Sequence, residues 1–388
     1  MNNEALSEAL AKGRLVVTAG SGGVGKTTVA AALAIGGAIW AERRVAVVTI
    51  DPARRLANAM GFDSMSGDLK AVSLDGLVDH TCRGSLHAMM LDVKTTSDAM
   101  VKRFSPDAKA AEAILKNPYY QHFAGALAGS QEYMAVEAVR SLLEDDQFDL
   151  VVLDTPPAVH ALDFFDAPRR LIEGLESSPV RMLAKYGSQA GQSLTGRIAR
   201  KGSSLMLKGL GRMAGGPFLE ELAEFLKLFG GILEALKEAS LTLEKLLRAE
   251  GVHFFLVLTP HLGSLESTLD FKKELAKRTL PFRGFILNKM HPGGVIALPE
   301  QDVLLDVLKT KRAGDLSLAL ADLEALKQFH QEEEVLHHRD RHIEDKLNRV
   351  STFPVLCIPS MSHEVHDLGG LLSMIETQVG PLRTRGKI

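Results

Sequence analysis

The sequence predicts an α/β fold, in which a mostly parallel sheet is flanked by helices on both faces and carries an inserted α-helical subdomain. Short, continuously apolar segments recur along the chain, and helical stretches separate them. Such segments are typical of parallel strands that are covered on both faces. One long stretch, residues 170–250, has no segment of this kind, and its second half shows apolar residues at helical spacing.

The first fifty residues predict a βαβ unit. The apolar, β-branched run at residues 15–19 ends in a glycine cluster, which indicates a strand followed by a loop. Residues 28–40 are alanine-rich and apolar all round, as expected for a helix buried against a sheet. Arg43 and Arg44 are expected to end this helix with positive charge. The apolar run at residues 45–50 predicts the second strand.

Later segments extend the sheet and divide the chain. Strands of the same kind are expected at residues 148–153, 253–258, 282–287 and 353–358. We expect a discontinuous sheet-bearing domain at residues 1–92, 147–169 and 251–388, and a helical subdomain at residues 93–146 and 170–250. A highly charged stretch at about residues 300–348 predicts a further helical insertion.

Composition excludes several classes of protein. The 45 basic and 48 acidic residues give a net charge of −3, so no global basic field attracts nucleic acid. Cys82 and Cys357 stand alone, which excludes a disulfide framework and a four-cysteine zinc site within one chain. No uncharged run exceeds fifteen residues, short of the ~18 of a membrane helix. We expect a soluble, cytoplasmic protein that can reach a membrane through a partner.

A phosphate-binding motif follows the first predicted strand. The motif and the residue after it are Gly20, Ser21, Gly22, Gly23, Val24, Gly25, Lys26, Thr27 and Thr28. Its glycines let backbone amides turn toward phosphate oxygens, and the next helix adds its positive N-terminal end. Lys26 is expected to lie between the β- and γ-phosphates, and Thr27 to offer a hydroxyl to Mg²⁺. The alternative is a glycine-rich turn that only connects strand to helix.

Two aspartates end predicted strands near this loop. Asp154 follows the run at 148–153, so we expect it at the carboxyl edge of the sheet, where it would hold Mg²⁺ through water. Asp51 closes the second strand and is a candidate catalytic residue. For both, the alternative is a helix-capping aspartate, and Pro52 after Asp51 strengthens that alternative.

These residues resemble a known group of ATPases. The doubled glycine before Val24-Gly25-Lys26-Thr27-Thr28 is similar to the deviant Walker A loop. Asp51-Pro52-Ala53 and the segment 154–160, Asp-Thr-Pro-Pro-Ala-Val-His, resemble switch I and switch II of one branch. That branch contains the arsenite-pump ATPase and the tail-anchored-protein-targeting ATPase. Residues 285–289, ending in Asn288-Lys289, resemble its adenine-recognition strand end, and Pro359 with residues 363–365 its second base-contacting loop.

The resemblance implies a dimer that hydrolyses ATP with Mg²⁺ and is gated by the nucleotide. It implies that Asp51 positions or activates the attacking water, with Lys26 as the second catalytic residue. Asp154 would hold Mg²⁺ through its water shell, and Asn288 would read adenine. Switch II would relay the γ-phosphate state to the helical subdomain. The dimer would form with a second copy or with a related ATPase.

Departures from the family pattern leave alternatives open. Ser21 stands where the branch has a lysine that reaches the partner's nucleotide, and Arg54 or Arg55 is a hypothetical substitute for that charge, against plain helix-surface solvation. A scaffold or chaperone with negligible hydrolysis is therefore one alternative. An ATPase subunit for arsenite or oxyanion efflux is another, although two separated cysteines disfavour a soft-ion site.

Two helical regions carry further hypotheses. Residues 177–219 hold seven basic residues, no acidic residue and three methionines, which favours a surface for a hydrophobic client or membrane-protein partner. The alternatives are a loose cover on the adjacent amphipathic helix, or contact with anionic lipid. His337, His338 and His342 lie on one predicted helix, where a solvated face is the main interpretation and a zinc site the alternative.

Overall fold

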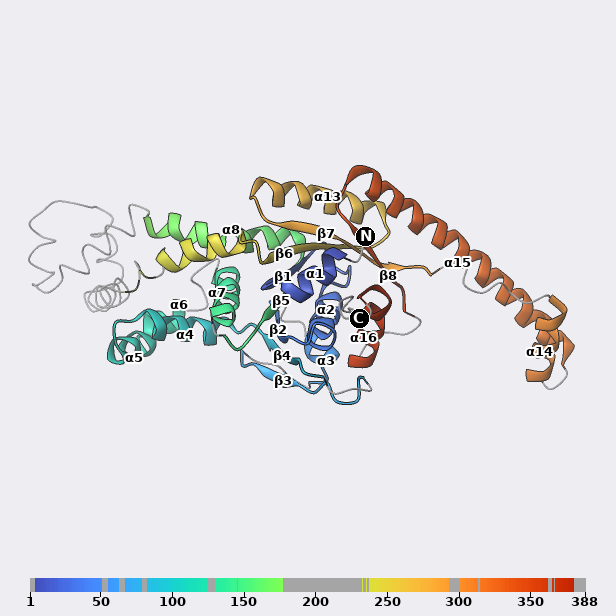
Figure 1. The fold of residues 1–388 in the computed structure, drawn as a ribbon, viewed down its shortest axis with the longest axis horizontal. Helices are drawn as coiled ribbons and strands as arrows, with labels where there is room; N and C mark the ends of the chain where they lie inside the picture. The colour runs from blue at the N-terminus through green and yellow to red at the C-terminus, as the bar shows by residue number, and fades with distance from the viewer. Residues whose placement is uncertain are drawn as a thin grey trace, which may run out of the picture.

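A computed structural model supplies the structure of the chain. It describes residues 4–50, 55–62, 67–78, 82–123, 130–144, 146–176, 237–292, 301–312, 315–361 and 367–379, together with residues 232, 235 and 365. Within these residues one sheet has the order β3-β4-β2-β5-β1-β6-β7-β8, and every pairing except β3 with β4 is parallel. The predicted α/β class with a mostly parallel sheet is therefore confirmed (Figure 1).

The strands and helices have the following bounds. The strands are β1 Leu15–Ala19, β2 Arg44–Thr49, β3 Lys70–Val72, β4 Ser85–Met90, β5 Leu150–Asp154, β6 Val252–Leu258, β7 Phe282–Met290 and β8 Val355–Pro359. The helices are α1 Glu4–Lys12, α2 Lys26–Ile39, α3 Arg55–Ala59, α4 Val93–Phe104, α5 Ala108–Lys116, α6 Pro118–Phe123, α7 Ser130–Glu144, α8 Ala158–Glu176, α13 Leu262–Lys277, α14 Gln301–Lys311, α15 Leu316–Val350 and α16 Leu368–Val379. Residues 237–247 are also helical.

The sheet is covered on both faces because neighbouring strand residues point to opposite sides. Val16 packs with α1, α2 and α16 on one face, whereas Val17 packs with α7, α13 and the end of α15 on the other. The same alternation separates Val152 from Leu153. These strands therefore have no polar face, which explains why they are apolar without interruption.

The two arginines after α2 differ from their predicted role. The helix ends at Ile39, and Arg44 is already the first residue of β2. The Arg43 guanidinium instead donates to the carbonyl oxygens of Gly13, Leu10 and Asp149. Arg43 therefore ties the end of α1 to the start of β5 and does not cap α2.

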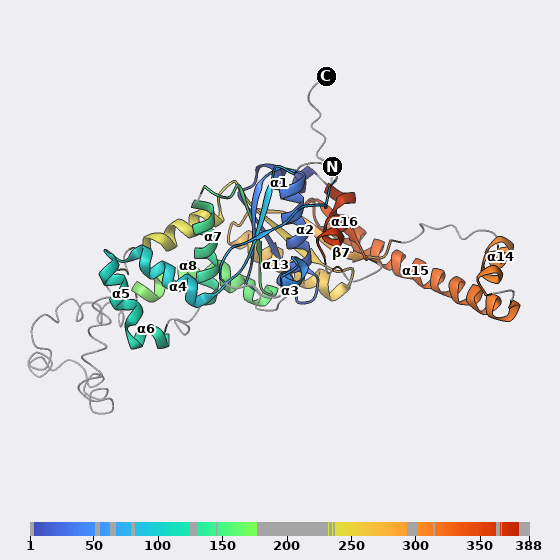
Figure 2. The same ribbon diagram turned by 90° about the horizontal axis from the view of Figure 1, so that it is seen from below.

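Helical insertions extend the molecule in two directions. Helices α4 to α7 lie between β4 and β5, as expected for residues 93–146, and project at one end of the sheet (Figures 1 and 2). α8 runs on through residue 176, past the expected domain boundary at 169/170. The whole of the basic, methionine-bearing stretch at 177–219, with its expected client surface, lies outside the described residues. Among the helices that the structure describes, none has the length and apolarity to cross a membrane.

The insertion between β7 and β8 forms a helical hairpin of α14 and α15 that projects at the opposite end of the molecule (Figure 2). The 35-residue α15 is anchored where it leaves the body, because the buried Asp340 carboxylate accepts from the backbone N–H and Nδ1 of His291, both at 2.8 Å. His337 Nδ1 lies 2.8 Å from the His291 carbonyl oxygen. His337 therefore contributes to this anchor. The described residues contain no group of three or more His, Cys, Asp or Glu side chains that could hold a metal ion.

Candidate nucleotide-binding site

The phosphate loop connects β1 to α2 at the carboxyl edge of the sheet, where ligands bind in open parallel sheets. Gly23 and Gly25 have φ values of 78° and 89°, a left-handed conformation that side chains disfavour. A Cβ on Gly20 would lie 2.1 Å from the Val257 carbonyl oxygen, so only glycine lets the loop start this close to β6. The backbone therefore requires the glycines of the motif.

Lys26 and Thr27 occupy the first turn of α2. The N-cap residue is Gly25, which has no side chain to bond the first N–H groups of the helix, so these remain available for an anion. The Lys26 side chain is 8% exposed, and its Nζ donates to the Ser21 carbonyl oxygen at 2.9 Å. The lysine is thus folded back over the loop that it is predicted to serve.

Asp154, the last residue of β5, is fully buried beside the loop. Its Oδ2 accepts from the hydroxyls of Thr27 at 2.7 Å and Thr49 at 2.9 Å. The strand register explains the second contact, because Thr49 is paired with Asp154 across β2 and β5. A carboxylate and a hydroxyl within hydrogen-bond distance at the phosphate loop are oxygen donors of the type that Mg²⁺ prefers, so these residues fit the expected metal.

Asn288 lies at the same edge, on β7. Its side chain is buried, and Nδ2 donates to the Val24 carbonyl oxygen at 2.9 Å. A Cβ on Gly25 would lie 2.4 Å from this same nitrogen. The residue expected to read adenine therefore also supports the phosphate loop. Pro359 ends the neighbouring strand β8, paired with Met290 of β7, which brings it to this edge.

Several candidate residues fall outside the described part of the chain. They are Asp51, Pro52, Ala53 and Arg54 of the predicted switch I, and His363 and Glu364 of the second base-contacting loop. Arg55 is the first residue of α3. The backbone N–H of Ile50, directly before Asp51, donates to the Asp154 carbonyl oxygen at 3.3 Å. The chain thus enters switch I beside the candidate metal ligand.

The structure adds residues that the sequence analysis did not identify. Thr49 is the only hydroxyl residue in the run 45–50. This feature of the sequence could have identified it as a candidate site residue. The Thr155 hydroxyl donates to the Thr18 carbonyl oxygen at 2.8 Å and fixes the start of switch II to β1. The Ser21 and Ser267 hydroxyl oxygens lie 2.8 Å apart, and no sequence signal connects two serines 246 residues apart.

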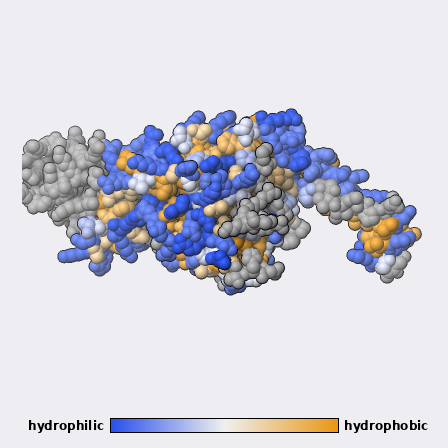
Figure 3. All heavy atoms as spheres, in the orientation of Figure 1, coloured by the Kyte–Doolittle hydropathy of each residue, from blue (hydrophilic) through white to orange (hydrophobic). Residues whose placement is uncertain are grey.

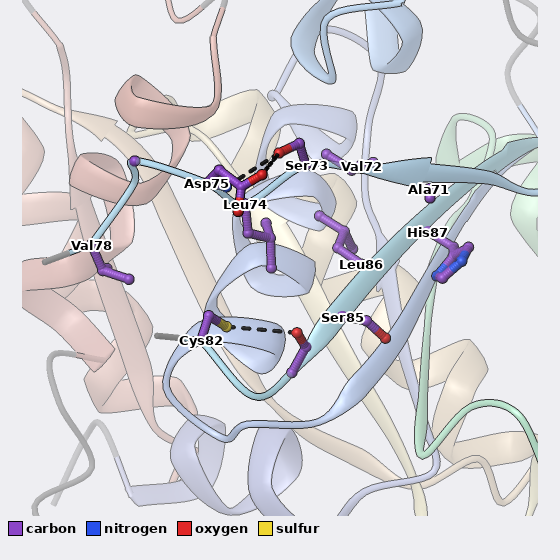
Figure 4. Close-up of a pocket in the computed structure, with 12 residues that line it drawn as sticks. Ala71, Val72, Ser73, Leu74, Asp75, Val78, Cys82, Ser85, Leu86 and His87 are labelled. Atoms are coloured by element: carbon purple, nitrogen blue, oxygen red, sulfur yellow. Dashed lines mark hydrogen bonds between the residues drawn. The ribbon is translucent and has the colours of Figure 1, made fainter. Parts of the chain in front are cut away.

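A surface hollow of about 510 Å³ lies elsewhere, beside the hairpin of β3 and β4 (Figure 4). Cys82 lines it, and its Sγ contacts the Gly84 carbonyl oxygen at 3.7 Å. Since β4 runs parallel to β2 and begins at Ser85, this hollow is at the amino edge of the sheet, opposite the phosphate loop. We therefore place the site at the loop.

Comparison with known proteins agrees with this geometry. A family profile described as anion-transporting ATPase matches residues 13–302, about three quarters of the chain, including the phosphate loop, Asp154 and Asn288. The chain belongs to this family. It is thus an ATPase of the same group as its similar relatives.

Those relatives carry two kinds of name. "ATPase ARSA2" of Chlamydomonas reinhardtii is 27% identical over 282 residues, which cover 71% of this chain and 67% of the relative. "ATPase get3" of Aspergillus terreus is 24% identical over 278 residues, 71% of this chain and 73% of the relative. "ATPase GET3" of Malassezia globosa is 31% identical over 156 residues, 40% of this chain and 43% of the relative.

Proposed function

We propose that the chain is a Mg²⁺-dependent ATPase whose nucleotide state gates a dimer and controls a helical partner-binding subdomain. The observation that carries the proposal is the 2.7 Å hydrogen bond from Thr27 of the phosphate loop to the buried Asp154 carboxylate. It joins the two parts of the proposed phosphate-and-metal site across 127 residues of sequence. A loop that only connected strand to helix would not need a buried carboxylate beside its threonine.

Each residue has a distinct proposed role. Lys26 moves from the Ser21 carbonyl to the β- and γ-phosphates, where it neutralises their charge. Thr27 and Asp154 would hold Mg²⁺, the threonine through its hydroxyl and the carboxylate through water. The ion supplies charge stabilisation for the transferred phosphoryl group. Asp51 orients the attacking water, and Asn288 binds adenine while it supports the loop.

The domain division and partners belong to the same proposal. Residues 1–92, 147–169 and 251–388 form the P-loop ATPase domain, and residues 93–146 and 170–250 the helical subdomain. The family resemblance supports a homodimer, or a heterodimer with a related ATPase. It also supports a hydrophobic client or membrane-protein partner, and a cytoplasmic location with access to the membrane through that partner.

Oxyanion efflux by a thiol-based site is disfavoured. β4, which follows Cys82, and β8, which carries Cys357, are six strand positions apart, about 29 Å at ~4.8 Å per strand. Burial, together with the negative charge of Glu344, also raises the pKa of the Cys357 thiol to about 12. Soft ions bind thiolates, and this thiol stays protonated at neutral pH.

ATP turnover by the purified full-length protein tests the proposal. We expect Mg²⁺-dependent hydrolysis in the wild type, loss of nucleotide binding in Lys26→Ala, and at least about a hundredfold lower turnover with retained binding in Asp51→Asn. Lys273→Ala, an exposed change on α13, is the matched control. If wild type and Asp51→Asn both bind ATP and turn over at background rate, the chain is a nucleotide-held scaffold. If the wild type binds no adenine nucleotide, the proposal is wrong.

A further inference from the structure

Ser21 is the one motif residue that departs from the family pattern, and it has a partner within its own chain. The side chains of Ser21 and Ser267, on the second turn of α13, meet at an oxygen–oxygen distance of 2.8 Å. The position that the resemblance assigns to a lysine directed at a partner subunit thus contacts this chain's own helix.

The direction of this hydrogen bond follows from counting protons. The Ser267 hydroxyl donates its one proton to the Ser264 carbonyl oxygen at 3.1 Å. It is left as an acceptor, so Ser21 is the donor. Ser264 is itself fixed, because its hydroxyl oxygen accepts from the Thr259 backbone N–H at 3.1 Å, directly after β6. The Ser267 hydroxyl oxygen that accepts from Ser21 is therefore held in place by the junction of β6 and α13.

Ser21 alone connects this contact to the proposed catalytic lysine. The Ser21 side chain bonds α13, and the Ser21 carbonyl oxygen accepts from Lys26 Nζ at 2.9 Å. On the other side of the loop, Asn288 bonds the Val24 carbonyl oxygen. The first half of the loop is thus held by β6 and α13, and the second half by β7.

We propose that Ser267 is a positioning residue for the phosphate loop and acts through Ser21. Its hydroxyl holds the backbone at Ser21, including the carbonyl group that Lys26 contacts before nucleotide binds. This keeps the loop in the conformation that binds a nucleoside triphosphate. The loop is thereby pre-organised within one chain, without a charge from a second subunit. The inference rests on the proposed function of the loop.

A double-mutant cycle on nucleotide affinity tests the proposal in the full-length protein. Ser21→Ala and Ser267→Ala should each weaken binding of Mg²⁺–ATP and raise KM by about threefold to tenfold, with kcat nearly unchanged, because one surface hydrogen bond that orders the loop is lost. The double variant should be no weaker than either single variant. Ser267→Thr, which keeps the hydroxyl, should restore affinity, and Lys273→Ala on the same helix should match the wild type. Additive losses in the double variant would overturn the proposal.

A second measurement needs no nucleotide. Hydrogen exchange of the amides at residues 20–27 should be faster in Ser267→Ala than in the wild type or Lys273→Ala, while exchange in the rest of α13 is unchanged. Equal exchange in all three proteins would overturn the inference, even if ATP binds normally. Absence of ATP binding by the wild type contradicts the proposed function instead, and the exchange comparison still decides the role of Ser267.

Discussion

A single carboxylate oxygen of Asp154 accepts hydrogen bonds from two threonine hydroxyls, one on α2 and one on β2. A buried carboxylate needs such donors, because an unsolvated negative charge is costly. Thr27 is expected to leave for the metal when nucleotide binds, whereas Thr49 comes from the sheet and has no such second role. We therefore expect the hydrogen bond from Thr49 to Asp154 to persist when nucleotide is bound.

Replacing this donor has a measurable cost. We expect Thr49→Val, which keeps the shape but removes the hydroxyl, to lower the free energy of unfolding by about 1.5 to 3 kcal/mol. Thr49→Ser should recover most of that loss. Chemical unfolding of the nucleotide-free protein measures both values, and a Thr49→Val protein as stable as the wild type would contradict the role given to this hydroxyl.

Some residues of the site are positioned by local sequence patterns, and others by contacts between distant parts of the chain. The phosphate loop and the strand before Asp154 are local patterns, so the sequence alone predicts them. The contacts of Asn288 with Val24 and of Ser21 with Ser267 join residues 264 and 246 positions apart. They depend on the order β5-β1-β6-β7 of the sheet, which periodicity does not reveal.

Among the elements, β3 and β4 show where the sequence pattern was too weak. β3 has three residues and pairs antiparallel at the sheet edge, and β4 contains Ser85 and His87 within an alternating burial pattern. β3 is the edge strand and β4 lies next to it. Both have partly exposed residues among the buried ones, so neither segment resembles the continuous apolar runs of the central strands. The central pair β2 and β5, by contrast, was predicted to within two residues at each end.

The start of that central pair is joined by an ion pair with a defined pH dependence. Arg44 Nη2 lies 2.6 Å from Asp149 Oδ1. The hydrogen bond from Arg44 lowers the pKa of Asp149 to about 2. A carboxyl whose folded-state pKa is lowered adds stability above its unfolded pKa, and this stability is lost as the pH falls toward 2.

We therefore expect Asp149→Asn to be less stable than the wild type by about 1 kcal/mol at about pH 5, a small value because the pair is partly exposed. The difference should shrink as the pH falls to about 2.5. Urea unfolding of both proteins at the two pH values measures it. A difference that is the same at both values would show that the Asp149 charge does not stabilise the strand pair.

At the scale of the whole molecule, the hairpin of α14 and α15 is the most unusual feature. Apolar side chains are exposed at its tip, where α14 meets the start of α15 (Figure 3). These side chains are Val303, Val307, Leu316, Leu318 and Leu320. Lys311 and Asp306 are exposed beside them. We therefore expect this projecting apolar tip to promote association of the protein in solution, even when the ATPase body is correctly folded.

We expect Val303→Asp combined with Val307→Asp to reduce concentration-dependent association and the binding of a hydrophobic dye, without changing ATP turnover. Both residues are exposed and belong to α14, which lies far from the phosphate loop between β1 and α2 (Figure 1). Light scattering and dye fluorescence measure the effect, with Lys311→Gln, at another exposed position of α14, as the control. Unchanged scattering and fluorescence would mean that the tip is not the adhesive surface.

The anchor of this hairpin connects α15 directly to the candidate nucleotide-binding site. Only two residues of chain separate Asn288, which lies on β7 and bonds the phosphate loop, from His291, which bonds Asp340. From Asp340 to Leu316, α15 extends 24 residues, about 36 Å at 1.5 Å per residue. Were β7 to tilt α15 by about 5° as ATP enters, the tip would swing through about 3 Å, on the scale of the helix shifts in known switches.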